Sequence, residues 1–333
     1  MASTAFQSLA KKATLSDGTT YGYVAVSPSK PGKPTFLLLH SYPSSSFDWR
    51  HQIASLPAAG YGVIALDLLG YGDTDKPKDV ASYRLKAMSS HISEILDREG
   101  VSRCIAVGHD WGCGLLSRLA NYIPDRLLGI VPVSVGYVEP GMSWDIDAFN
   151  QFTEQFFGYP TYGYWPWHNT EQAVKDCDDH PASVFTLTYA ADAEDWKVNL
   201  APIGAAREYV TAGKVDALPS WYNLEDYTTR DRILASGYQG PMSWYKAAMR
   251  GVNDADEAAF PTREDKLCKV PTLLVVSDKD YVTRADMQIM KAKEFVRDLH
   301  IQTVEGCGHW IQLDRADELH NLLDGFAAKV ATV

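Results

Sequence analysis

The sequence predicts an α/β fold in which a mostly parallel sheet is wound with helices and interrupted by an inserted helical segment. Two observations predict the sheet: short apolar runs alternate with stretches of helical period, and a glycine-flanked turn joins one such run to a helix. A third predicts the insertion, because strand-like runs stop in the middle of the chain and aromatic residues gather there. The 333 residues exceed one typical domain of ~100–200 residues, which leaves room for a core and an insertion.

The core strands are expected where apolar residues run almost without a break, as in strands that are covered on both faces. These runs lie at residues 35–40, 63–67, 103–108 and 127–133, and two further strands are expected at 272–276 and 300–304, where the alternation of strands and helices resumes. Helical period marks residues 88–99, 114–122, 285–296 and the stretch from 316 onward. Ahead of them, residues 12–15 and 20–26 flank a turn signal, Asp17-Gly18, which predicts an antiparallel hairpin.

The inserted segment begins after Tyr137, where helical period replaces the β-type runs and tryptophan, tyrosine and phenylalanine become frequent. The α/β rhythm resumes after about Ala259. We therefore expect residues 1–137 and 259–333 to form one α/β core and residues 138–258 to form a helical cap.

Composition excludes several classes of protein. With 46% hydrophobic and 22% charged residues the chain is neither disordered nor fibrous. Its net charge of -11 repels polyanions, so neither a nucleic acid nor an anionic membrane is expected as a partner. The five cysteines are an odd number without CxxC spacing, which favours reduced thiols in an intracellular protein. No signal peptide or membrane-spanning run is found, so we expect a cytoplasmic location.

The most informative motif is Gly108-His109-Asp110-Trp111-Gly112, which follows one predicted strand and precedes a helix. Small residues two positions either side of a central residue allow the sharp strand-to-helix turn that lifts a nucleophile above a sheet. The central residue here is Asp110, whose carboxylate at a helix N-terminus is ionised without a separate base. A simple helix cap is the competing interpretation of Asp110.

Two further motifs favour catalysis over capping, because each follows a later predicted strand. Asp280 lies after the strand at 272–276, and His309 lies in Gly306-Cys307-Gly308-His309-Trp310 after the strand at 300–304. The carboxyl ends of parallel strands are where such sheets build their sites, so we expect a nucleophile, an acid and a histidine to meet there. The backbone N–H groups of Tyr42, after the first core strand, and Trp111 are then the expected oxyanion hole.

No metal or cofactor is expected. The histidines His109, His168 and His180 lack ligand spacing to carboxylates or thiols and are interpreted as hydrated loop residues. No G-x-G-x-x-G motif follows a strand, so a dinucleotide site is not predicted.

These motifs together resemble the α/β-hydrolase superfamily, in particular the branch that holds soluble epoxide hydrolases and haloalkane dehalogenases. The resemblance extends from about Tyr21 to the last helix and also includes Ser46 to Arg50 and Asp67 to Gly72. It implies an α/β-hydrolase fold with a cap, and attack by an aspartate on a carbon that carries a leaving group. One position departs from the usual His-Gly-x-Pro, and we expect Ser41 to adopt there a turn that glycine normally eases.

The epoxide hydrolase branch further implies two cap tyrosines that donate hydrogen bonds to the epoxide oxygen. Gly240-Pro241-Met242-Ser243-Trp244-Tyr245 resembles the cap motif that supplies one of them, Tyr245. The second is expected to be Tyr164, with Tyr162 and Tyr159 as alternatives. We expect the substrate to contact five residues: His40, Pro43, Trp111, Tyr162 and Trp165.

Two other functions remain open at this stage. A haloalkane dehalogenase would hold a halide between Trp111 and a cap tryptophan, Trp165 or Trp167, and some of these enzymes take their acid from the position of Glu139. A ligand-binding protein on the same fold would leave the triad unused. The expected partner is a small apolar or aryl epoxide, and the oligomeric state is open, with a homodimer as one alternative.

Overall fold

The computed structural model describes residues 2–142, 144–223, 225 and 236–331, and these form an eight-stranded sheet in the order β1-β2-β4-β3-β5-β6-β7-β8. The strands are β1 (Ala10–Thr14), β2 (Thr20–Val26), β3 (Thr35–Leu39), β4 (Gly62–Leu66), β5 (Cys104–His109), β6 (Leu127–Val133), β7 (Thr272–Ser277) and β8 (Leu299–Val304). The first two form the predicted hairpin, and β2 pairs antiparallel with β4. All pairings from β4 to β8 are parallel.

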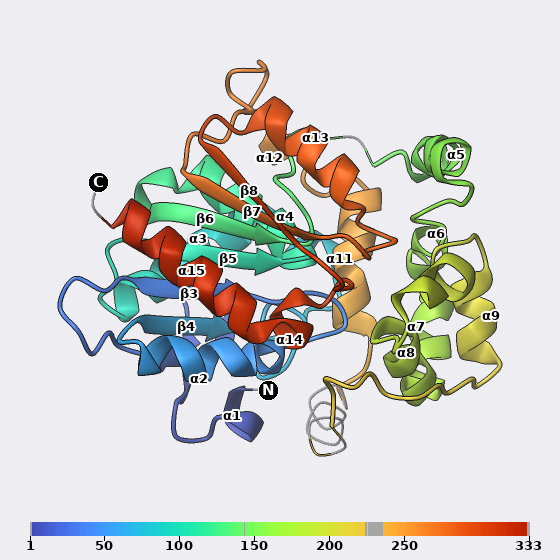
Figure 1. Ribbon diagram of the computed structural model, residues 1–333, viewed down its shortest axis with the longest axis horizontal. Coiled ribbons are helices and arrows are strands. Elements are labelled where there is room, and N and C mark those ends of the chain that lie inside the picture. The colour runs from blue at the N-terminus through green and yellow to red at the C-terminus, as the bar shows by residue number, and fades with distance from the viewer. Residues whose placement is uncertain (1, 143, 224, 226–235, 332–333) are drawn as a thin grey trace.

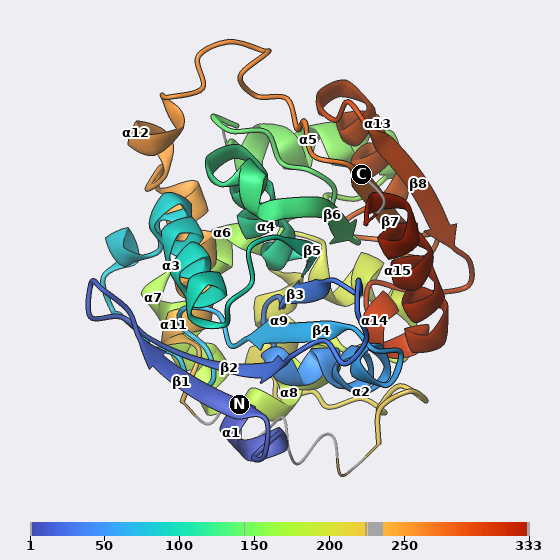
Figure 2. The same cartoon turned by 90° about the vertical axis from the view of Figure 1, so that its left-hand side faces the viewer.

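Alternate residues of the central strands supply two hydrophobic layers, one on each face of the sheet. Leu37 and Leu39 of β3 pack toward one layer, whereas Phe36 and Leu38 pack toward the other. Helices α3 (Leu85–Arg98), α4 (Trp111–Tyr122) and α13 (Ala285–Phe295) cover the first face, and α2 (Arg50–Ala58) and α15 (Ala316–Val330) cover the second. Figure 2 shows α3 and α4 on the opposite side of the sheet from α2 and α15.

The remaining elements are mostly short helices. They are α1 (Ala2–Ala5), α5 (Ile146–Phe157), α6 (Trp165–His168), α7 (Glu171–Asp179), α8 (Pro181–Thr188), α9 (Ala205–Thr211), α11 (Gln239–Met249), α12 (Asp254–Glu257) and α14 (Ile311–Asp314). Single 3-10 turns lie at Ser46–Trp49, Val80–Ser82, Pro124–Arg126 and Ala193–Asp195, and a π-helical turn lies at Trp196–Leu200. Among the described residues, no helix is both long and apolar enough to cross a membrane.

Between β6 and β7, the described residues contain helices and turns and no strand. Figure 1 shows α5 to α9 gathered at one end of the sheet, with α11 between them and the strands. An aromatic cluster joins these helices to the core, because Tyr42 and Trp111 of the core pack with Trp165 and Tyr245. The insertion therefore covers the carboxyl ends of the central strands, where Asp110 lies.

The predicted strands agree with the structure to within a residue at each end, except that β1 begins two residues earlier than predicted, and the helices agree less closely. Helix α4 begins at Trp111, three residues before the predicted start. Gly112 lies within the first turn of this helix, where it packs against Leu39 of β3. Helix α2 was not predicted. Only Ile53 and Leu56 of its apolar residues are buried in the core, and Pro57 lies inside it, so its sequence has a weak helical pattern.

Candidate active site

The turn between β5 and α4 places Asp110 at the carboxyl end of the sheet. Its backbone is left-handed, with φ 49° and ψ -115°, a conformation that is strained for a residue with a side chain. The flanking glycines are needed for close packing: a Cβ on Gly108 would lie 2.7 Å from the Gly112 carbonyl oxygen, and a Cβ on Gly112 would overlap the carbonyl oxygen of Leu39. This is the sharp turn that the motif predicts.

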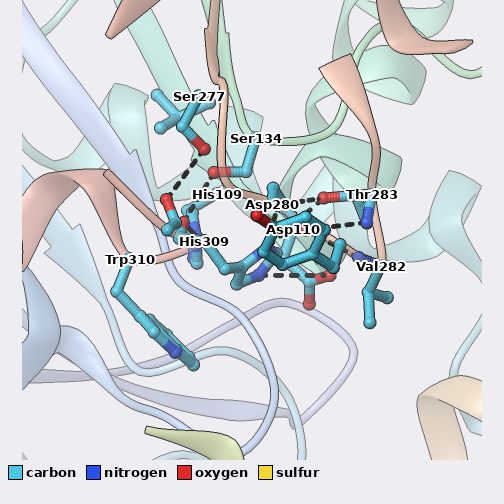
Figure 3. A network of polar contacts seen from close by, with 12 residues as sticks. His109, Asp110, Ser134, Ser277, Asp280, Val282, Thr283, His309 and Trp310 are labelled. Carbon is cyan, nitrogen blue, oxygen red and sulfur yellow. Dashed lines mark hydrogen bonds and ion pairs between the residues drawn. The ribbon is translucent and has the colours of Figure 1, made fainter. Parts of the chain in front are cut away.

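His309 lies between the two predicted carboxylates (Figure 3). Its Nδ1 is 2.6 Å from Asp280 Oδ2, and its Nε2 is 3.8 Å from Asp110 Oδ2. Asp280 also accepts backbone hydrogen bonds from Val282 at 3.0 Å and Thr283 at 2.9 Å. The structure thus brings the three residues together, with the Asp280 carboxylate fixed on one side of the imidazole and the Asp110 carboxylate facing the other.

Burial and mutual charge shift the pKa values of these residues. Burial raises the pKa of the Asp110 carboxyl, although His309 and the backbone N–H of Trp111 oppose the shift. Burial acts on Asp280 in the same direction, but its ion pair with His309 prevails and the net pKa of Asp280 is lowered. Burial lowers the pKa of His309, yet the Asp280 carboxylate outweighs it, so the net pKa of His309 is raised. The carboxylates therefore increase the basicity of the imidazole.

The loop that carries His309 is held by three polar side chains that the sequence did not indicate. Ser277 Oγ donates to the Gly308 carbonyl at 2.8 Å, and Ser134 Oγ donates to the His309 carbonyl at 2.7 Å (Figure 3). His109 Nε2 donates to the same His309 carbonyl at 3.0 Å. His109 is fully buried, so its interpretation as a hydrated loop residue was wrong. No sequence signal could find these contacts, because their partners lie from 31 to 200 residues away in the chain.

The loop after β3 lies against Asp110. The backbone N–H groups of Trp111 and Tyr42 donate hydrogen bonds to the Asp110 carboxyl. These hydrogen bonds oppose the rise that burial causes in the pKa of Asp110. Among the described residues other than glycine, only Asp110 and Ser134 have positive φ, so Ser41 does not need the turn that glycine eases. The Ser41 hydroxyl instead lies 3.2 Å from His109 Nδ1. The expected strain is therefore absent at Ser41, which contributes a contact that glycine cannot make.

A cavity between the sheet and the helical insertion contains both Asp110 and His309. Tyr245 and Tyr164 line it, with their rings 6.0 Å apart and both side chains buried. Burial raises the pKa of each phenol well above its usual value, and the nearby Asp110 carboxylate adds to both shifts. Both hydroxyls therefore stay protonated and can donate hydrogen bonds over Asp110.

The two alternatives to Tyr164 lie elsewhere. Tyr162 stacks on Trp165 at 5.1 Å and faces a smaller adjoining hollow that also reaches Asp110 and Trp111. Tyr159 donates its hydroxyl to the Tyr281 carbonyl at 2.8 Å and does not line either space. The geometry thus favours Tyr164 as the partner of Tyr245.

None of the five expected substrate contacts lines the cavity itself. Trp111, Tyr162 and Trp165 line the smaller adjoining hollow, whereas His40 and Pro43 line neither space. The buried His40 ring accepts a hydrogen bond from the Leu68 N–H at 3.0 Å through Nε2, and its Nδ1 lies 2.8 Å from the Ser41 carbonyl oxygen. It therefore joins the loops after β3 and β4. Pro43 follows a cis peptide bond and its carbonyl accepts from Tyr189 at 3.4 Å.

The structure also shows where Glu139 and His168 lie. Glu139 forms an ion pair with Lys291 at 3.0 Å and makes no described contact with His309, so the geometry favours Asp280 as the acid. His168 was taken as a hydrated loop residue, but it is only 4% exposed and lines the cavity. Among the described residues, no group of three or more histidine, cysteine, aspartate or glutamate side chains is arranged to hold a metal ion.

The topology and the strand-to-helix turn define the class of protein. A family profile described as "alpha/beta hydrolase fold" matches residues 34–164. The crystal structure of epoxide hydrolase A from Mycobacterium thermoresistibile superposes with a TM-score of 0.80, covers 95% of this chain and 98% of that chain, and is 24% identical. The chain therefore has the α/β-hydrolase fold, as predicted.

Two curated relatives with similar sequences are named as epoxide hydrolases. Epoxide hydrolase B of Mycobacterium tuberculosis is 28% identical, and the match covers 93% of this chain and 95% of that protein. Bifunctional epoxide hydrolase 2 of Mus musculus is 25% identical over 91% of this chain, which spans only 54% of the mouse protein. The resemblance to the epoxide hydrolase branch is confirmed.

Proposed function

We propose that this protein is an epoxide hydrolase that opens an epoxide to a vicinal diol through a covalent ester on Asp110. The arrangement around Asp110 carries the proposal: His309 and Asp280 lie on one side of its carboxylate, and the phenols of Tyr245 and Tyr164 line the same cavity. The names of the relatives support the same reaction. A triad without such phenols would serve displacement of a halide equally well, so the tyrosines are what favour an epoxide.

In the first step a carboxylate oxygen of Asp110 attacks one epoxide carbon. The carbon–oxygen bond of the ring breaks, and its electron pair goes to the epoxide oxygen, which takes a proton from Tyr245 and a hydrogen bond from Tyr164. The product is a hydroxyalkyl ester of Asp110 and a tyrosinate at Tyr245.

In the second step His309 Nε2 takes a proton from water, and the water oxygen attacks the ester carbonyl carbon of Asp110. The N–H groups of Trp111 and Tyr42 stabilise the oxyanion, and Asp280 stabilises the imidazolium. When the intermediate collapses, the ester C–O bond breaks and the diol oxygen takes the proton from His309. The acid proton left on Asp110 returns to the Tyr245 tyrosinate. The oxygen of the water thereby remains in the carboxylate of Asp110, and a former carboxylate oxygen leaves with the diol.

Isotope labelling tests this mechanism. A single turnover of styrene oxide in oxygen-18 water should place label in the peptide that contains Asp110, as measured by mass spectrometry. Label in the diol alone would contradict an ester on Asp110. Halide release from a dihaloalkane without diol formation from any epoxide would favour the dehalogenase, and binding of epoxides without turnover would favour the ligand-binding protein.

Two variants separate the steps. Asp110→Ala should abolish turnover, whereas His309→Gln should stop only the second step, so that intact protein gains the mass of one substrate molecule. Asp278→Asn is the matched control, because Asp278 lies two residues from Asp280 and accepts a hydrogen bond from the Cys307 N–H outside the cavity. It should keep normal turnover and show no added mass.

A further inference from the structure

His168 is a buried polar side chain that faces the active-site cavity and has no hydrogen-bond partner among the described residues. It ends α6, lines the cavity with Asp110, and is 4% exposed. Within the described part of the chain, no group hydrogen-bonds its Nδ1, and none of the hydrogen bonds found there uses its Nε2. A buried ring nitrogen without a partner is costly, and where it faces a ligand cavity the missing partner is expected to come with the ligand.

The surroundings of His168 place it close to the reacting atoms. Its ring centre is 4.6 Å from that of Tyr245, 5.2 Å from that of Tyr164 and 5.1 Å from that of Tyr42. Tyr245 and Tyr164 are the proposed donors to the epoxide oxygen, so a substrate group that reaches His168 lies close to the epoxide ring. Many of the other residues that line the cavity are apolar, among them Val184, Leu187, Leu200, Val210 and Val282.

The imidazole is neutral, because burial lowers the pKa of His168 to about 3. A neutral imidazole offers one N–H donor and one acceptor nitrogen, which suits a hydroxyl or carbonyl group. A substrate carboxylate would have to be buried beside it without a compensating charge, which is unfavourable.

We propose, on the basis of the epoxide hydrolase function above, that His168 hydrogen-bonds a neutral oxygen on the carbon next to the epoxide ring. The substrate class is thus an epoxide that carries an apolar or aryl body on one carbon and a hydroxymethyl or carbonyl group on the other. His168 is a specificity-determining residue in this reaction, and it is distinct from the two tyrosines that contact the epoxide oxygen.

A matched pair of substrates tests the proposal: 3-phenylglycidol and trans-β-methylstyrene oxide differ only by one hydroxyl. The native enzyme should favour the phenylglycidol about tenfold in kcat/KM, mainly through KM, because one neutral hydrogen bond to a buried partner is worth about that factor. His168→Phe keeps an aromatic ring but loses both nitrogens, and it should reduce the preference to within about twofold. Any general effect of the exchange on the cavity acts on both epoxides, so the ratio of their kcat/KM values is the quantity to compare.

His180→Phe is the matched control, since His180 precedes α8 in the same insertion and does not line the cavity. It should keep the tenfold preference. An unchanged preference in His168→Phe, or an equal loss of activity toward both epoxides, would overturn the proposal and leave His168 as a packing residue.

Binding measurements separate this proposal from the proposed function. Calorimetry with the corresponding phenyl triol and phenyl diol requires no turnover. The native protein should bind the triol about tenfold more tightly and His168→Phe should bind both alike. If neither epoxide is hydrolysed but this difference holds, the proposed function fails and the assignment of His168 stands. Equal binding by the native protein would overturn the assignment of His168 alone.

Discussion

Single residues control the chemistry of the site through burial and charge. The Asp280 carboxylate, 2.6 Å from His309, raises the net pKa of the imidazole above its ordinary value of 6.5, despite burial. Asp110 is held in a backbone conformation that is rare for a residue with a side chain. The first feature depends on a contact between two loops that are distant in the chain. The second is allowed by the glycines of the local motif around Asp110.

The pH dependence of turnover should report the charge on His309. Water activation needs a neutral imidazole, so hydrolysis of the Asp110 ester should fall as the pH drops through the pKa of His309, which the Asp280 carboxylate raises against the effect of burial. Asp280→Asn removes the carboxylate that raises this pKa, and the acidic midpoint should move to lower pH while the maximal rate falls. Rapid-quench measurement of ester decay against pH checks both shifts. An unmoved midpoint in Asp280→Asn would contradict this assignment.

A series of tyrosine variants should identify the oxygen donors. Tyr245→Phe and Tyr164→Phe should each slow formation of the Asp110 ester by about 10²–10³-fold, because each removes a donor to the developing alkoxide. Tyr159→Phe should have little effect, since that hydroxyl is engaged by the Tyr281 carbonyl. The measurement is single-turnover alkylation, followed by tryptophan fluorescence. A larger loss in Tyr162→Phe than in Tyr164→Phe would exchange the roles of these two residues.

Among the elements, the contact between α4 and β3 fixes the turn that carries Asp110. The backbones approach so closely that Gly112 has no space for a methyl group beside Leu39. On the same helix, a Cβ added to Gly114 would meet no described atom within 4 Å. Close packing therefore requires a glycine at position 112 but not at position 114. The sequence motif includes Gly112 and gives no reason for Gly114.

Alanine at these two positions should change stability in opposite directions. Gly112→Ala should lower the free energy of unfolding by about 1–3 kcal/mol, because β3 cannot move away without disturbing the sheet. Gly114→Ala should raise it by about 0.5–1 kcal/mol, because alanine favours a helix more than glycine does. Urea denaturation followed by circular dichroism measures both. Equal effects of the two substitutions would contradict the close approach of α4 to β3.

Across the whole chain, one buried ion pair joins both ends of the helical insertion to the core. Arg118 of α4 donates through Nε to Glu257 at 2.6 Å and through Nη1 to the Val138 carbonyl at 2.7 Å. Both charged side chains are less than 10% exposed. Glu257 also accepts from the Gly141 N–H. The segments that enter and leave the insertion thus meet at one guanidinium group.

Removing this cation should destabilise the protein more than removing an exposed one. Arg118→Met leaves Glu257 buried without its partner, and the free energy of unfolding should fall by about 3–5 kcal/mol. Lys175→Met breaks the exposed Lys175–Asp179 pair on α7 and should cost less than about 1 kcal/mol. Guanidinium denaturation of both variants provides the comparison. Similar losses would mean that the Arg118 pair does not hold the insertion.

Local sequence patterns were enough to predict the sheet, its succession of α and β elements, and the positions of Asp110, Asp280 and His309. They could do so because buried parallel strands leave continuous apolar runs, and functional residues follow the ends of such strands. The inserted helices were also predictable, because their aromatic residues form a pattern unlike that of the core. These are properties of nearby residues and their spacing.

The packing of distant segments, and not the local sequence, determines which side chains contact one another. That packing joins Ser41 and His109 to the loop of His309, removes His40 from the expected substrate contacts, and places His168 in the cavity. Each outcome depends on contacts between segments far apart in the chain, and a polar residue has the same local pattern whether it faces water or a buried partner. Only the burial of the residue and its partners from distant segments distinguish a polar residue in water from one with a buried partner, and the local sequence pattern contains neither.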